Sequence, residues 1–170
     1  LGVKIKKNKN ELQIIGNKGV FPKFNGTINV GSAGTVVRFL MALITLVPGR
    51  VIIKKSKRMR MRPIKELDDA LTSIRTGKVS IRGDISSQFI SSLLMTAPVL
   101  KNGLVIKITG KLVSRSYVDM TIGLLNKFGI KVVNKQYKQL VIEKNQKYKQ
   151  VTLNIEGDAS GASYFWAIAA

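Results

Sequence analysis

The sequence predicts a mixed α/β (α+β) fold built from repeated βαβαββ units, because three observations agree. A pattern of strand, glycine and helix start occurs three times, at residues 27–35, 78–87 and 152–161. Two similar segments, 1–15 and 128–143, each show short apolar runs around a polar turn, which is typical of a β-hairpin. A chain of 170 residues that is 45% apolar is also long enough to bury a core.

The sequence pattern of the N-terminal part predicts the end of one repeated unit and most of the next unit. In chain order the predicted elements are a hairpin at 1–15, a strand at 27–31, a helix at 36–47, a strand at 51–53 and a helix at 63–74. The hairpin would close a unit that begins earlier. Pro63 suits the first turn of the second helix, because proline lacks an amide donor and that turn needs none.

The central copy of the repeat is complete. Its predicted elements are a strand at 78–83, a helix that starts near Ser86, a strand at 104–108, a helix at 114–128 and a hairpin at 130–133 and 140–143. Gly129 is well placed to end the second helix. The third copy predicts a strand at 152–157 and a first helix that contains residues 165–170.

The unit before the central copy lacks its hairpin. Gly83 and Gly157 hold equivalent places and lie 74 residues apart, whereas Gly31 and Gly83 are 52 residues apart. The shortfall of 22 residues falls near positions 74–75. The sequence therefore predicts that the chain begins at the hairpin of an earlier unit and that the next unit lacks its own hairpin.

The composition excludes several kinds of chemistry. The chain has no Cys and no His, which removes Cys/His zinc sites, thiol nucleophiles, disulfides and His-dependent triads. The acidic residues show no ligand spacing, so no metal site is predicted. A net charge of +20 attracts anions of any kind. The longest apolar stretch is shorter than the roughly 18 residues that a membrane span needs, so no membrane partner is expected.

The junctions between strand, glycine and helix form the candidate binding site. They place Ser32, Thr35, Ser86, Ser87, Asp158 and Ser160 at or near helix starts. Taken singly, such residues are N-caps that satisfy amide donors. Three units around a common axis would instead bring positive helix ends together, which suits a phosphate or a carboxylate. The backbone at Gly34 is small enough for such a ligand to come close.

An arginine-rich segment follows the strand at 51–53. If this segment is extended, Arg58, Arg60 and Arg62 lie on one side and could grip a carboxylate or a phosphate through paired hydrogen bonds. A solvated run of charges is the alternative interpretation. The position favours ligand binding, because loops at the ends of strands gather ligands in α/β sheets.

Five strings in this sequence resemble consecutive blocks of the 3-phosphoshikimate 1-carboxyvinyltransferases, the EPSP synthase family. The strings are Gly31-Ser-Ala-Gly-Thr-Val-Val-Arg38, Arg58-Met-Arg-Met-Arg-Pro-Ile64, Ile85-Ser-Ser-Gln-Phe-Ile-Ser-Ser-Leu-Leu-Met95, Ser114-Arg-Ser-Tyr-Val-Asp-Met120 and Glu156-Gly-Asp-Ala-Ser-Gly-Ala-Ser-Tyr-Phe165. The resemblance implies the enolpyruvyl transferase fold, an inside-out α/β barrel in each of two domains, here incomplete. It implies that residues 1–155 belong to the first domain, without its N-terminal part and without the hairpin near 74–75, and that residues 156–170 are the crossover and the start of the second domain. The related UDP-N-acetylglucosamine enolpyruvyl transferases share the repeats but not the Ser-Ser-Gln-Phe string.

The resemblance implies transfer of the enolpyruvyl group of phosphoenolpyruvate to the 5-hydroxyl of shikimate 3-phosphate, with release of phosphate and without metal or organic cofactor. It assigns shikimate 3-phosphate to Ser86, Ser87, Gln88, Ser114 and Tyr117. It assigns phosphoenolpyruvate to Gly34, Arg58 and Gln88, with Thr35 and Arg38 as second choices. The expected partners are these two small anions, in a cytoplasmic enzyme that is a monomer at full length.

The resemblance assigns no catalytic residue to this chain. The lysine-bearing N-terminal segment of the family and its second domain, which supplies the general-base Asp, lie outside the sequence. We therefore expect the chain alone to be inactive, because closure across the cleft supplies positioning and excludes water. Two further interpretations stay open. A pI near 10.5 fits a basic nucleic-acid-binding module, although the lysines are spread evenly. The chain could also be a folded remnant that no longer catalyses.

Overall fold

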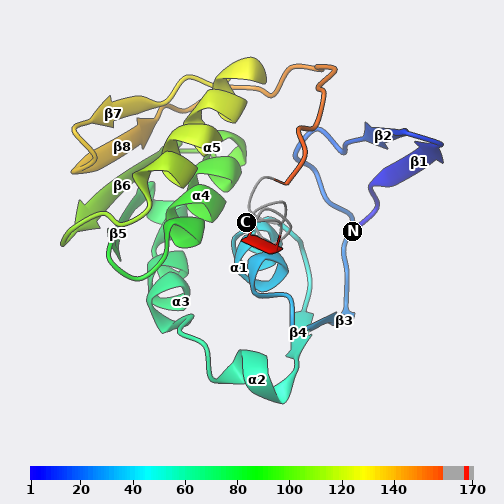
Figure 1. The fold of residues 1–170 in the computed structure, drawn as a ribbon, viewed down its shortest axis with the longest axis horizontal. Coiled ribbons are helices and arrows are strands. Elements are labelled where there is room, and N and C mark those ends of the chain that lie inside the picture. The colour runs from blue at the N-terminus through cyan, green and yellow to red at the C-terminus, as the bar shows by residue number, and fades with distance from the viewer. Residues whose placement is uncertain (159–166, 169–170) are drawn as a thin grey trace.

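The computed structural model describes residues 1–158 and 167–168 of the chain. The described part forms three regions that follow one another along the chain (Figure 1). They are an N-terminal hairpin, a two-stranded sheet with its helices and a four-stranded sheet with its helices. No barrel closes within this part, which agrees with an incomplete domain of repeated units. No helix in these residues is long and apolar enough to cross a membrane.

The N-terminal hairpin is confirmed. It consists of β1 (Lys4–Asn8) and β2 (Glu11–Ile15), which pair antiparallel with Ile5 opposite Ile14. Every residue of both strands is exposed. The reason is that no other strand of the described chain pairs with either of them.

The second region is the unit that lacks a hairpin, and we call it the open unit. Its elements are β3 (Gly26–Gly31), α1 (Gly34–Ile44), β4 (Val51–Lys55), α2 (Lys57–Arg60) and α3 (Lys65–Thr72). The strands β3 and β4 pair in parallel and form a sheet of their own. After α3 a single 3-10 turn, Ile74–Thr76, leads directly into the next unit, so the shortfall of residues is visible as a missing hairpin.

The third region is the complete unit, and it confirms the predicted βαβαββ order. Its elements are β5 (Lys78–Arg82), α4 (Ser87–Thr96), β6 (Leu104–Thr109), α5 (Arg115–Lys127), β7 (Val133–Lys135) and β8 (Gln139–Ile142). The sheet order is β5-β6-β8-β7. The pair β5–β6 is parallel, whereas β6–β8 and β7–β8 are antiparallel.

The two units bury very different cores. Nineteen buried residues, centred on α4 and the four-stranded sheet, form the core of the complete unit together with one face of α3. The core of the open unit has three buried residues, Val30, Val37 and Met59. Met41 in α1 packs against both clusters. Helix α4 lies between α1 and α5 and joins the two units.

The arginine-rich segment is not extended, so the prediction of alternating arginines is wrong. Residues 57–60 form the short helix α2, because Ser56 caps its start by accepting a hydrogen bond from the Met59 N–H at 3.3 Å. The helix turns Met59 into the core, where its exposed fraction is 1%. Burial of this one large apolar side chain therefore outweighs the extended alternative.

The first strand of the C-terminal hairpin begins later than predicted, at Val133 rather than at residue 130. Gly129 has a positive φ of 80°, and the Ile130 N–H donates to the Leu125 carbonyl. The Lys131 N–H donates to the side chain of Gln146. These amide groups close the end of α5 and hold the following segment, so they are not available to a strand ladder.

Three smaller differences remain. The helix predicted at 36–47 is α1, which begins at Gly34 and ends at Ile44. The strand predicted at 152–157 does not form, because a strand needs a neighbouring strand and none lies beside this segment in the described chain. Of the first helix predicted around 165–170, only residues 167–168 are described, and they are helical. The rest of that prediction, with Ser160, lies outside the described residues.

Candidate anion-binding site

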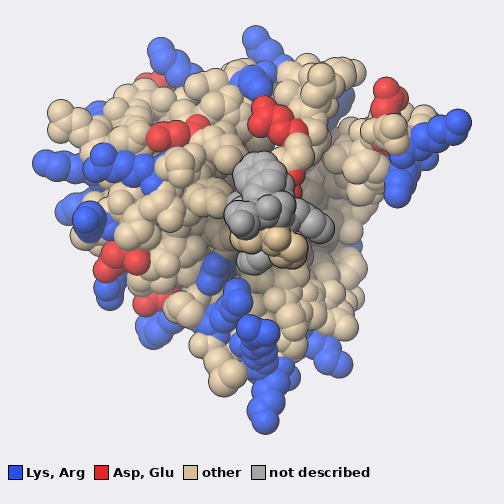
Figure 2. Space-filling view, viewed as in Figure 1, with Lys and Arg blue, Asp and Glu red and all other residues tan. Residues whose placement is uncertain are grey.

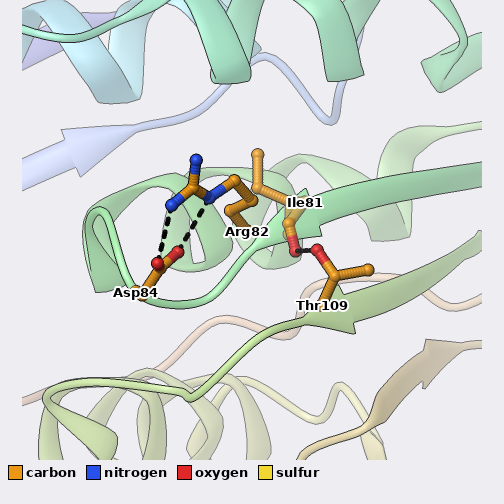
Figure 3. A network of polar contacts seen from close by, with 4 residues as sticks. All are labelled: Ile81, Arg82, Asp84 and Thr109. Atoms are coloured by element: carbon orange, nitrogen blue, oxygen red, sulfur yellow. Dashed lines mark hydrogen bonds and ion pairs between the residues drawn. The ribbon is translucent and has the colours of Figure 1, made fainter.

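The turn that leads from β5 into α4 is fixed by contacts on both sides. Arg82 donates two hydrogen bonds to the Asp84 carboxylate, at 3.0 and 2.7 Å (Figure 3). These bonds hold the pKa of Asp84 below its usual value. A Cβ atom at Gly83 would lie 2.8 Å from Ile108 Cγ2 and 3.0 Å from the Leu112 Cα, so only glycine fits without a shift of the backbone. The start of α4 is therefore held in place.

The two serines at this start play different parts. Ser86 is the N-cap of α4, and its Oγ accepts a hydrogen bond from the Gln88 N–H at 3.3 Å. Ser87 is buried, with 7% of its surface exposed. Its hydroxyl makes no hydrogen bond within the described residues, so it can still bind a ligand.

The start of α5 lies beside the same turn. The Val113 N–H donates to the Gly83 carbonyl at 3.1 Å, which ties the loop before α5 to the turn before α4. Ser114 follows with a φ of 56°, and its hydroxyl does not cap the helix. For a residue other than glycine this backbone conformation costs about 1–3 kcal/mol, and such strain is concentrated at ligand sites. Tyr117 lies in the first turn of α5 and is exposed.

The start of α1 lies against an arginine of the α2–α3 connection. Gly34 is buried in the first turn, and a Cβ atom there would lie 2.9 Å from Arg62 Nη1. Ala33, the N-cap residue, offers no side-chain hydrogen bond to the helix. The first amide donors of α1 therefore lack a capping side chain, which leaves them available to an anion.

A chain of hydrogen bonds joins the start of α1 to the start of α4. Arg38 Nη1 donates to Gln88 Oε1 at 2.6 Å and lies 3.5 Å from the Ser86 Oγ. Gln88 Nε2 donates to Thr35 Oγ1 at 3.0 Å. A guanidinium can only donate, so Gln88 must turn its amide oxygen to Arg38 and its NH₂ group toward the helix starts.

The site is electrostatically positive. The guanidinium of Arg38 lies 5.3 Å above the centre of the Phe89 ring, and burial followed by the charge of Arg62 lowers its pKa. Its Nε is buried and has no hydrogen-bond partner in the part of the chain that the structure describes. The ion pairs found there, Lys65–Asp69 and Arg82–Asp84, involve neither Arg38 nor Arg62. Two guanidinium groups therefore face two helix N-termini without a neutralising carboxylate.

The structure brings most of the predicted site residues together. Gly34, Thr35, Arg38, Ser86 and Gln88 form one connected cluster. Ser87 lies within the same helix start, and the start of α5 with Ser114 and Tyr117 is joined to it through the Gly83–Val113 hydrogen bond.

Arg58 is the exception. It is exposed in α2 and forms no hydrogen bond or ion pair within the described residues. Figure 2 shows a group of Lys and Arg at the lower end of the view, where α2 lies in Figure 1. Arg62, which the sequence singled out only as a member of this run, lies against Gly34 instead. No sequence pattern distinguished Arg62 from Arg58, because the short helix α2 that precedes Arg62 was not predicted.

Two open hollows lie near this cluster, and the second of them borders it. One, of about 490 Å³, lies between α1, β4 and α3. The other, of about 400 Å³, is an apolar groove between α1 and α4 that Thr35 borders. The cluster itself is an open surface on which hydroxyl groups, amides and guanidinium groups converge. Its donors suit an anion, and among the described residues no group of three or more acidic side chains could hold a metal ion.

Comparisons with known proteins identify the chain's relatives. The sequence model of the EPSP synthase (3-phosphoshikimate 1-carboxyvinyltransferase) family matches residues 1–76 and 72–170. The 3-phosphoshikimate 1-carboxyvinyltransferase of Shewanella woodyi is 40% identical over 167 residues, which cover 85% of this chain and 39% of that protein. That of Sulfurovum sp. is 37% identical over 196 residues, covering 100% of this chain and 46% of that protein.

The solved EPSP synthase of Acinetobacter baumannii shares the fold, with a TM-score of 0.73 and 15% identity over 96% of this chain and 41% of that chain. The chain thus spans less than half of the length of these relatives. The Sulfurovum alignment extends over 196 positions for a chain of 170 residues, and the two family matches meet at residues 72–76, where the hairpin is missing. On these matches the chain belongs to the EPSP synthase family.

Proposed function

We propose that this chain is most of the substrate-binding first domain of an enzyme that transfers the enolpyruvyl group of phosphoenolpyruvate to the 5-hydroxyl of shikimate 3-phosphate. In this proposal residues 1–155 belong to that domain and residues 156–170 lead into a second one. The parent protein would be a cytoplasmic monomer that needs no metal or organic cofactor.

The observation that carries the proposal is the bridge formed by Gln88. The side-chain amide of Gln88 contacts Arg38 and Thr35 of α1, and the backbone of Gln88 belongs to the capped start of α4. Two helix N-termini and two arginines therefore share one polar surface. This arrangement suits two neighbouring anions, because positive helix ends and guanidinium groups favour phosphate and carboxylate groups.

Each binding residue has a role that its local structure supports. The hydroxyls of Ser87 and Ser114, which do not bond within the described chain, would hold the phosphate of shikimate 3-phosphate together with Ser86. Tyr117 would contact the ring, and the NH₂ group of Gln88 would reach both ligands. The start of α1 at Gly34 would receive phosphoenolpyruvate, with Thr35 and Arg38 beside it. Because Arg58 is exposed, it would reach this ligand only after the side chain turns inward.

The chain by itself would bind without catalysing. The site is an open surface, so it supplies neither the water exclusion nor the second set of groups that positions both reactants. Part of the ligand charge would remain in contact with solvent. We therefore expect weak binding of shikimate 3-phosphate and no turnover.

Isothermal titration calorimetry of the chain with shikimate 3-phosphate tests the proposal. Ser87→Ala should abolish most of the heat, because it removes a buried hydroxyl that would bond to the phosphate. Loss of one such hydrogen bond to a charged group costs about 1–3 kcal/mol of binding free energy. Ser116→Ala, on an exposed residue of the first turn of α5, is the matched control and should leave the titration unchanged. Equal heats for wild type and Ser87→Ala would contradict the assignment.

A further inference from the structure

The turn between β7 and β8 has a backbone conformation that its residues do not favour. Gln136 and Tyr137 are its central residues, with positive φ angles of 52° and 55°. The Lys138 N–H closes the turn by donating to the Lys135 carbonyl at 3.0 Å. A turn with two such residues usually contains glycine or asparagine, because most side chains make a positive φ unfavourable. Surrounding contacts must therefore hold this turn in place.

Tyr137 makes such contacts, and they join the turn to α5. Its hydroxyl donates to the Asp119 carboxylate at 2.6 Å. The guanidinium carbon of Arg115 lies 4.9 Å from the centre of its ring, which is a distance typical of a cation–π contact. The hydrogen bond to Asp119 raises the pKa of Tyr137, so the hydroxyl is protonated and can donate at neutral pH. One side chain of the hairpin thus contacts two residues of α5.

The pairing of the sheet places this turn near the start of α5. Strand β8 runs antiparallel to β6, with Gln139 opposite Lys107, and the Ile108 N–H donates to the Lys138 carbonyl at 2.9 Å. The turn therefore lies at the end of β6 from which the chain continues into α5. The register of the strands thus fixes the position of Tyr137.

The residues that Tyr137 contacts lie in the first two turns of α5. Arg115 directly follows Ser114, whose φ is 56° and whose side chain does not cap the helix. Arg115 also places a positive charge at the positive end of the helix dipole, which is unfavourable. The Val113 N–H, bonded to the Gly83 carbonyl, holds the loop before the helix, whereas Tyr137 holds the helix itself.

The far end of α5 is held by different contacts. Phe128, which follows the last residue of the helix, packs edge-on against Tyr148. The Tyr148 hydroxyl donates to the Met95 carbonyl, near the end of α4, at 2.6 Å. Each end of α5 is therefore next to a tyrosine whose hydroxyl makes a hydrogen bond. Only Tyr137 lies at the end that carries residues of the candidate site.

We propose that Tyr137 is a positioning residue for the candidate site. It holds Arg115 and Asp119, and so keeps the first turn of α5 in the arrangement that receives shikimate 3-phosphate. The inference rests on the proposed function, in which Ser114 and Tyr117 bind this ligand. Tyr137 does not need to touch the ligand, because its effect passes through the helix. Without it the start of α5 would populate other conformations, and the affinity would fall with the fraction of molecules that are ready to bind.

The affinity for shikimate 3-phosphate, measured by titration calorimetry on the 170-residue chain, is the first test. Tyr137→Phe removes the hydroxyl and keeps the ring over Arg115. The dissociation constant should rise about threefold to tenfold, because a hydrogen bond to a charged group is lost. Asp119→Ala should raise it by a similar factor. The double variant should show little further change, since both substitutions break the same bond.

Two controls separate positioning from stability. Tyr148→Phe removes a hydroxyl hydrogen bond of the same length at the other end of α5. It should lower the melting temperature of the chain and leave the dissociation constant unchanged. Gln136→Gly, added to Tyr137→Phe, relieves the positive φ at position 136 and should raise the melting temperature toward that of the wild type. The dissociation constant of this double variant should stay as high as that of Tyr137→Phe.

Hydrogen exchange without ligand observes the start of α5 directly. In Tyr137→Phe the backbone amides of the first two turns of α5 should exchange faster than in the wild type, whereas those of the last turn should not change. Tyr148→Phe should show the opposite distribution. This measurement does not depend on binding, so it reports on Tyr137 separately from the proposed function.

Three results would overturn the proposal. Tyr137→Phe could bind shikimate 3-phosphate as tightly as the wild type does, or Tyr148→Phe could weaken binding as much. Gln136→Gly could also restore the affinity of Tyr137→Phe together with its stability, which would mean that Tyr137 only stabilises the fold. A wild-type chain that gives no heat would contradict the proposed function and this inference with it. Unchanged exchange at the start of α5 in Tyr137→Phe would contradict the inference alone.

Discussion

The open unit and the complete unit begin alike and end differently. Both have a parallel strand pair, a helix that starts at a small-residue turn, and a second helix. Only the complete unit has the hairpin, and with it Ile106 is fully buried, whereas the equivalent Ile53 is half-buried beside a cavity. The comparison shows that the hairpin covers the outer strand of the sheet, whereas the turns at the helix starts form without it.

This separation has a functional consequence. The cluster of Thr35, Arg38, Ser86 and Gln88 lies at the helix starts of both units. In the complete unit the hairpin lies along the outer edge of β6, so the missing hairpin would lie along the outer edge of β4. Its absence should therefore affect stability more than the geometry of the candidate site.

The largest expected effect on stability comes from truncating two equivalent isoleucines to alanine. Ile106→Ala should lower the free energy of unfolding by about 2–5 kcal/mol, because it leaves a cavity in a closely packed core. Ile53→Ala should cost about 1 kcal/mol, because its side chain already borders an open cavity. Urea denaturation of both variants measures the difference. Equal losses would mean that β4 is as well covered as β6.

A graft of the missing hairpin is the second test. Inserting a second copy of residues 129–144 after Ile74 should add a strand to β4 and raise the free energy of unfolding by roughly 1–3 kcal/mol, through burial of apolar area. Hydrogen exchange of the amides of β4 should slow at the same time. A graft with Lys in place of both apolar core residues of the inserted strand is the control and should protect β4 no better than the parent chain does. Unchanged exchange in the apolar graft would show that the open unit does not accept a hairpin.

The turn glycines give a smaller contrast. Gly83→Ala should destabilise the chain by about 1–3 kcal/mol, because the new methyl group would meet Ile108 and the backbone of Leu112 in a packed turn. Gly31→Ala meets no atom within 4 Å, and its cost of about 1 kcal/mol comes from the positive φ of 55° alone. Thermal unfolding of the two variants compares them. A larger loss at Gly31 would reverse the interpretation of which turn is packed.

Much of the fold could be predicted because the repeat carries its own local signals. The alternation of β5, the glycine at 83 and the Ser86 cap are all encoded within a few residues, and the structure forms them as expected. The segment 57–60 could not be predicted, because its helix depends on the burial of Met59 in a core made by distant residues. The start of β7 depends likewise on the side chain of Gln146, which lies 15 residues away from Lys131.

The candidate site was predictable in its residue types but not in its connections. Helix-start serines and the glycine at 34 follow from sequence pattern. That Arg38 orients Gln88, and that Arg62 rather than Arg58 lies against Gly34, are consequences of how α1, α2 and α4 pack. These contacts join residues that lie 50 positions (Arg38 and Gln88) and 28 positions (Gly34 and Arg62) apart along the chain, and sequence periodicity has no information at such distances.

The smallest expected effect concerns the segment that covers the complete unit after β8. Tyr148 packs edge-on against Phe128 and donates its hydroxyl to the Met95 carbonyl at 2.6 Å, and burial raises its pKa from 10.0 to about 12. The folded state therefore favours the neutral phenol, and this contribution is complete below pH 10 and is lost as the pH rises from 10 toward 12. Urea denaturation at pH 9 and pH 11 should show the advantage of the wild type over Tyr148→Phe shrinking at the higher pH. An advantage that is constant across this range would mean that the folded state does not favour the neutral phenol.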